Sequence, residues 1–100
     1  MSSYTVHIIP GAWSEVRDLP GHVRQRVRRA ISELATNPRP PHSQPLEASG
    51  FPRELRRLRL DRWRIVYAVS EAEQAVDVLA VRKRPPYDYG DLEKLLDTLR

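Results

Sequence analysis

Three segments with the pattern of β-strands follow one another in the second half of this 100-residue chain. They run from Glu54 to Leu60, from Trp63 to Ser70 and from Ala75 to Arg82. Each alternates apolar with polar residues or is rich in β-branched and aromatic residues, and the turn-like residues EAEQ separate the last two. Strands joined by such short turns pair with their neighbours, so the sequence predicts an antiparallel meander.

The first half of the chain predicts one strand and two helices. In the strand, Tyr4, Val6 and Ile8 alternate with Thr5, His7 and Ile9, and Pro10-Gly11 closes it. Apolar residues at helical spacing then predict a short helix before Pro20 and a longer one that ends at Asn37-Pro38, with the stripe Val23, Val27, Ala30, Ile31, Leu34 and Ala35. With about two residues between them, the two helices should form an antiparallel hairpin.

The remaining segments complete the expected fold. Residues 37–52, NPRPPHSQPLEASGFP, are rich in proline and predict a loop that is neither helix nor strand. From Asp91 onward, leucines at helical spacing predict a final amphipathic helix. The expectation is one α+β domain over residues 1–100, in the order β-α-α-β-β-β-α. The helical hairpin covers one face of a small, mostly antiparallel sheet, and the arginine-bearing face stays partly open.

Arginines concentrate on and beside the first strand of the meander, in the run RELRRLRLDRWR from Arg53 to Arg64. Because side chains alternate along a strand, Arg57 and Arg59 share one face. Two neighbouring guanidiniums repel each other, and an anion that bridges them removes that cost. This pattern favours a phosphate-binding surface, although charged residues also protect exposed strands against aggregation. We assign Arg53, Arg56 and Arg62 to electrostatic steering and solubility.

A second basic group follows the last predicted strand. The segment VRKRPPYDY supplies Arg82, Lys83, Arg84, Tyr87 and Tyr89. In a meander the end of the last strand returns beside the start of the preceding one. Arg84 and the two tyrosines should therefore approach Arg64, which lies on the sheet face opposite Trp63.

Composition restricts the chemistry available to the chain. The formal charge of +4 and the pI near 10.0 favour a polyanionic or acidic partner. The absence of cysteine excludes disulfides, thiolate zinc sites and cysteine nucleophiles, and His7, His22 and His42 lack ligand spacing, so we expect no metal and no cofactor. No export signal or membrane-spanning run is visible, and the expected location is the cytoplasm.

Taken together, these features resemble the RelE/ParE superfamily of bacterial toxin–antitoxin pairs. The matching elements are the hairpin ending LATNPRP, the pair Arg57 and Arg59, the strand WRIVYAV and the segment VLAVRKRPPYDY, in the order that the family shows. RelE-like members cut messenger RNA in the ribosome through attack of a 2′-hydroxyl on the adjacent phosphate, whereas ParE-like members poison DNA gyrase. The resemblance also implies a cognate antitoxin, whose acidic C-terminal segment wraps the hairpin and sheet edge and covers the basic site.

The resemblance also assigns roles to residues. Basic positions of the RelE-type site map onto Arg57, Arg59, Arg64 and Arg84, and the C-terminal tyrosine falls at Tyr87 or Tyr89. The chain departs from the RelE pattern in having arginines where lysines are common and no histidine in its C-terminal loop.

These roles can be tested against the chemistry of RNA cleavage, which needs a base for the 2′-hydroxyl. Arginine is a poor proton acceptor because its pKa exceeds about 12, so a tyrosine whose pKa is lowered by nearby cations is the candidate base or substrate-stacking group. Arg64 and Arg84 would hold the scissile phosphate, and Arg57, Arg59, Arg82 and Lys83 would bind the flanking RNA. The leading expectation is a metal-independent, ribosome-dependent endoribonuclease. A ParE-like gyrase inhibitor and a non-catalytic basic nucleic-acid-binding module are the alternatives.

Overall fold

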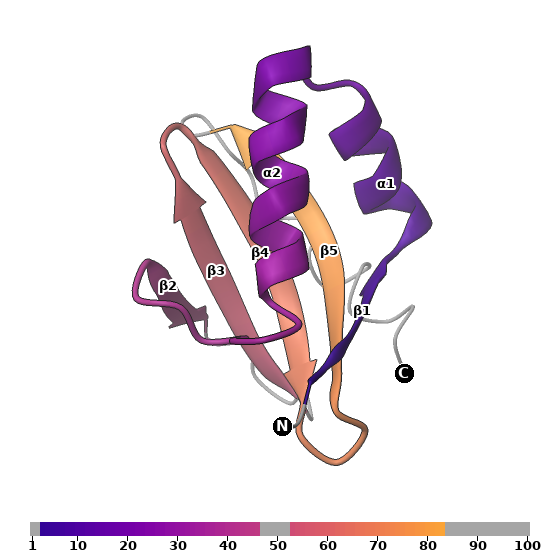
Figure 1. Ribbon diagram of the computed structural model, residues 1–100, viewed down its shortest axis with the longest axis vertical. Coiled ribbons are helices and arrows are strands. Elements are labelled where there is room, and N and C mark those ends of the chain that lie inside the picture. The colour runs from indigo at the N-terminus through magenta and orange to yellow at the C-terminus, as the bar shows by residue number, and fades with distance from the viewer. Residues whose placement is uncertain (1–2, 47–52, 84–100) are drawn as a thin grey trace.

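A five-stranded sheet with two helices on one face forms the part of the chain that the computed structural model describes, residues 3–46 and 53–83 (Figure 1). The elements are β1 (Thr5–Ile8), α1 (Pro10–Arg17), α2 (Gly21–Glu33), β2 (Ser43–Leu46), β3 (Glu54–Leu60), β4 (Trp63–Ser70) and β5 (Ala75–Lys83). The predicted helix from Asp91 lies outside the described residues. No helix in the described ranges is long and apolar enough to cross a membrane.

The antiparallel meander is confirmed. The strands lie in the order β1-β5-β4-β3-β2, and β3, β4 and β5 pair as antiparallel neighbours with bounds within one residue of those predicted. The first strand, β1, pairs in parallel with β5, and the helical hairpin that follows it connects β1 at one edge of the sheet to β2 at the other. β4 therefore occupies the centre, which suits its apolar run from Ile65 to Val69.

The helical hairpin is also confirmed, with small differences at its ends. α1 begins at Pro10, a residue suited to the first helical position because its missing N–H needs no partner there. α2 ends at Glu33, earlier than Asn37-Pro38. The next three residues continue in tighter turns whose N–H groups bond to carbonyls three residues back, which satisfies carbonyls at the helix end.

One prediction for this half of the chain was wrong. Residues 37–52 were expected to contain no strand, but Ser43–Leu46 forms β2 and pairs with β3 at the edge of the sheet. Pro45, which stands opposite Arg56, cannot donate to a strand ladder, and proline is tolerated only at edges of this kind. The sequence signal for a loop was proline itself, and tertiary pairing overrode it.

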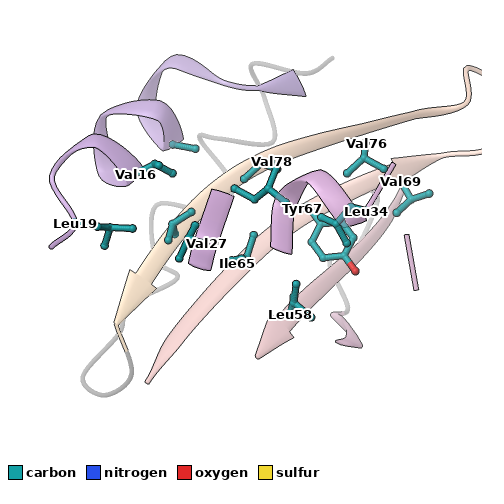
Figure 2. Packing of buried hydrophobic residues seen from close by; sticks show 13 residues of the cluster. Val16, Leu19, Val27, Leu34, Leu58, Ile65, Tyr67, Val69, Val76 and Val78 are labelled. Carbon is teal, nitrogen blue, oxygen red and sulfur yellow. The ribbon is translucent and has the colours of Figure 1, made fainter. Parts of the chain in front are cut away.

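Buried side chains form one large cluster between the helices and the sheet (Figure 2). It joins residues of both helices to alternate residues of the strands: Ala12, Val16, Leu19, Val27, Ile31, Leu34, Leu58, Ile65, Tyr67, Val69, Val76, Val78 and Val81. A smaller buried cluster, Leu55, Val66, Ala68, Leu79 and Ala80, occupies the opposite face. The arginine-bearing face, which was expected to stay partly open, is therefore apolar and buried over its middle.

A β-bulge in β5 changes which side chains share this second face. Val66 of β4 stands opposite Ala80, but Tyr67 stands opposite Val78, so Leu79 is an extra residue in β5. Without the bulge, strict alternation would place Ala80 and Arg82 on the helix side with Val78. The extra residue reverses the alternation, and Arg82 comes to stand opposite Arg64.

Tyr67 is fully buried, as expected for a core residue, and its hydroxyl donates a hydrogen bond of 2.7 Å to the carbonyl oxygen of Pro38. We expect Tyr67→Phe to lower the free energy of unfolding by about 1–2 kcal/mol, because the Pro38 carbonyl loses its buried donor. Urea unfolding at neutral pH measures this loss. An unchanged midpoint would show that water replaces the hydroxyl.

The same tyrosine has a consequence at high pH. Burial raises the pKa of Tyr67, so the unfolded chain releases this proton first as the pH rises through about 10. Its contribution to stability is present below that pH and is lost above it. Tyr67→Phe should therefore show a shallower decline of the urea midpoint above about pH 10 than the wild-type protein.

Candidate functional site

Three arginines from three neighbouring strands stand in one row across the sheet. Arg59 of β3 is opposite Arg64 of β4, and Arg64 is opposite Arg82 of β5. Arg57 stands two residues before Arg59 on the same face. We call Arg59, Arg64 and Arg82 the arginine row. Opposed side chains on one face of a sheet have Cβ atoms roughly 5 Å apart, so the row concentrates positive charge.

Arg64 occupies the centre of the row and is 4% exposed. Its Nη1 donates to the carbonyl oxygen of Asp61 in the β3–β4 turn at 2.8 Å and to that of Trp63 at the start of β4 at 2.9 Å. Asp61 adopts a positive φ of 54°, a conformation that aspartate tolerates better than most residues. The tight β3–β4 turn thus holds a buried guanidinium in a defined place.

Arg82 is held at its end of the row by Glu15 of α1. Its Nε donates to Glu15 Oε2 at 3.2 Å, and the other carboxylate oxygen accepts the N–H of Val81 at 3.1 Å. β1 pairs with β5 only as far as Val78, so Glu15 takes up an N–H beyond the end of β1. Sequence reasoning missed Glu15. No local pattern marks it, because its partners lie 66 and 67 residues away.

The two arginines of β3 differ in their surroundings. Arg57 is half-buried and donates to Gln44 Oε1 of β2 at 3.1 Å. Arg59 is exposed and makes no ion pair or side-chain hydrogen bond with the described part of the chain. Glu15 is the carboxylate that the described contacts bring to the arginine row. An anion bound across it would relieve the mutual repulsion.

Arg53 and Arg56 have structural roles, and their assignment to steering and solubility was wrong. Arg53 pairs with Asp77 of β5 at 2.5 Å. Arg56 pairs with Glu54 at 2.8 Å and donates to Ser43 Oγ at 2.9 Å, which ties β3 to β2. These half-buried contacts hold strands together at a distance from the arginine row.

The remaining residues of the predicted site are Lys83, Arg84, Tyr87 and Tyr89. Lys83 is exposed and stands opposite Trp63 at the end of β5. Arg84, Tyr87 and Tyr89 lie outside the described residues. Within residues 3–46 and 53–83, no group of three or more histidine, aspartate or glutamate side chains could hold a metal ion.

Comparison with known proteins decides the family. The model of the ParE toxin of the type II toxin–antitoxin system parDE matches residues 8–85. This chain belongs to the ParE toxin family. It is therefore a type II toxin of the RelE/ParE superfamily, and the resemblance seen in the sequence is confirmed. A search of curated protein sequences found no significant match.

Solved structures of RelE toxins share the fold of this ParE-family toxin. The archaeal RelE–RelB complex from Pyrococcus horikoshii OT3 has 24% identity and a TM-score of 0.75 over 85% of this chain and 99% of that one. RelBE2 from Mycobacterium tuberculosis has 22% identity and a TM-score of 0.69 over 82% and 99%. Isolated RelE from E. coli has 20% identity and a TM-score of 0.67 over 98% and 100%. At these identities the likeness establishes the fold and leaves the target of the toxin open.

Proposed function

We propose that this toxin cuts messenger RNA on the ribosome by attack of a 2′-hydroxyl on the adjacent phosphate. The observation that carries the proposal is the arginine row, three arginines in register on three strands with a buried, anchored guanidinium at the centre. The fold shared with RelE toxins supports the same reading.

The chemistry divides between charge stabilisation and proton transfer. Attack on a phosphodiester builds negative charge on the phosphorus oxygens, and preorganised donors stabilise it best when they do not move during the reaction. Arg64 fits that role because the turn carbonyls already fix its position. Arg57 and Arg59 would hold the flanking backbone.

Proton transfer needs residues other than arginine, which stays protonated near neutral pH. We assign the base to Tyr87 or Tyr89 and a second phosphate contact to Arg84. A site with no group that readily donates a proton at neutral pH should cut free RNA slowly. The ribosome would then position the substrate and lower the entropic cost of ordering it.

A cognate antitoxin is the proposed protein partner. The similar structures from Pyrococcus horikoshii and Mycobacterium tuberculosis are complexes of a toxin with an antitoxin. An acidic antitoxin segment that covers the arginine row would neutralise its charge and block RNA.

A ParE-like gyrase inhibitor is the second candidate, and one observation favours it. The family model that matches the chain is that of the ParE toxin. The two candidates predict different lesions in the cell, namely cut messages or gyrase-dependent DNA breaks.

The test is to induce the toxin in cells and map cuts in ribosome-bound messages, beside the variant Arg64→Ala, Arg84→Ala. The proposal expects translation arrest with cuts inside reading frames, both lost in the variant. Intact messages with gyrase-dependent DNA breaks would replace it with the second candidate. Tight, salt-sensitive RNA binding without growth inhibition would indicate a non-catalytic binding module.

A further inference from the structure

A cationic hollow of about 880 Å³ opens where three elements end together. Its lining includes Arg26 of α2, Arg59, Asp61, Arg62 and Trp63 around the β3–β4 turn, and Lys83 of β5. Figure 1 shows the start of α2, this turn and the end of β5 together at the top of the view. We call this hollow the tip pocket.

The tip pocket differs in position from the arginine row. Trp63 packs against the cluster beneath the helices, and Lys83 stands opposite it in register. The pocket therefore lies on the helix side of the sheet, whereas Arg64 lies on the other side. Arg59 borders both, so the two basic regions meet near the end of β3.

The pocket carries more positive charge than its own contacts neutralise. Arg26 pairs with Asp61, the carboxylate in the lining. Arg59, Arg62 and Lys83 have no ion pair or side-chain hydrogen bond within the described part of the chain, which leaves a surplus of three positive charges. The nearby start of α2 has no side-chain cap and no acidic residue in its first turn, so its partial positive charge adds to the surplus.

We propose that the tip pocket is a second RNA-binding site, which holds the phosphate backbone of a single strand that continues from the arginine row. This inference rests on the proposed function, because that function makes RNA the polyanion. Arginine forks match phosphate oxygens, and a half-buried indole beside them offers a face or edge for a base. Shared Arg59 makes one continuous path from the row to the pocket. Arg62, first assigned to steering, becomes a contact residue.

The chain offers a reporter inside the pocket. The chain has two tryptophans, Trp13 and Trp63, and Trp13 is exposed on α1 outside the pocket. A Trp13→Phe background leaves Trp63 as the sole source of tryptophan fluorescence. The probe is a short single-stranded RNA that is fully 2′-O-methylated, which binds without being cut.

The test compares Arg62→Gln, Lys83→Gln with Arg28→Gln, Arg29→Gln in this background. Both pairs remove two positive charges, but Arg28 and Arg29 are exposed on α2 outside the pocket lining. RNA should quench Trp63 in the parent. The pocket variant should bind the RNA about tenfold more weakly than the parent. The slope of the logarithm of its association constant against the logarithm of the salt concentration should be smaller in magnitude by about 1.4, as expected when two contacts to single-stranded RNA are lost. The control pair should stay within about twofold of the parent in affinity.

Two results would overturn the inference: a pocket variant that matches the parent in affinity and salt slope, or a polyglutamate peptide that binds and quenches Trp63 as strongly as RNA. The second result would assign the pocket to an acidic protein. Cutting of messages on ribosomes is measured separately. The wild-type toxin could fail to cut messages while the pocket variant still binds RNA more weakly than the parent. That result would reject the proposed cleavage and keep the inference that the tip pocket binds RNA.

Discussion

Arg64→Gln is expected to lower the rate of ribosome-dependent mRNA cutting by about 10²–10³-fold, the usual effect of removing one preorganised donor to developing charge. Glutamine keeps a polar group but loses the cation at the centre of the arginine row. The measurement is a single-turnover assay with programmed ribosomes, in which the rate at saturating toxin is separated from the concentration dependence. The loss should appear mainly in the saturated rate, since the proposed contact strengthens as charge develops.

The controls for this experiment separate charge from folding. Arg28→Gln removes the same charge from an exposed site on α2 and should cut at nearly the wild-type rate. Because Arg64 also donates to the β3–β4 turn, its variant should lose about 1–2 kcal/mol of stability, which urea unfolding reports. A folded Arg64→Gln variant that cuts at the wild-type rate would remove Arg64 from the reaction.

Ile65→Ala is expected to lower the free energy of unfolding by about 3–4 kcal/mol, a large part of the 5–15 kcal/mol typical of a domain. Ile65 is fully buried in β4 and belongs to the cluster between the sheet and the helices (Figure 2). Truncation to alanine removes buried methyl groups and leaves a cavity that a close-packed core fills only in part. Ile65→Val should cost only about 0.5–1.5 kcal/mol.

Ile8→Ala makes the same chemical change at a half-buried position on β1 and is the matched control. It should cost clearly less than Ile65→Ala when both are measured by urea unfolding. Equal losses at the two positions would show that the core does not centre on β4. The alanine variant should also lose activity at temperatures where it begins to unfold.

The parts of the fold that were predicted correctly depend on local pattern. The bounds of β3, β4 and β5 follow from two-residue periodicity and short turns, both of which are properties of neighbouring residues. The same periodicity placed Arg57 and Arg59 on one face of β3 and Arg64 opposite Trp63 on β4. β2 was missed because its proline is a local signal for a loop, while its pairing with β3 is a long-range contact.

The sequence by itself determined a meander, a covering helical hairpin and a basic surface on one strand. Hydrophobic periodicity and local charge depend only on residues that are close together in the sequence. Only the tertiary structure decided the composition of the arginine row. The bulge at Leu79 reverses the alternation of β5 and brings Arg82 beside Arg64, and Glu15 reaches Arg82 from α1. The tip pocket likewise exists because α2, the β3–β4 turn and β5 end together. Such features arise from packing between distant segments, where the strand register and the element ends depend on the whole core.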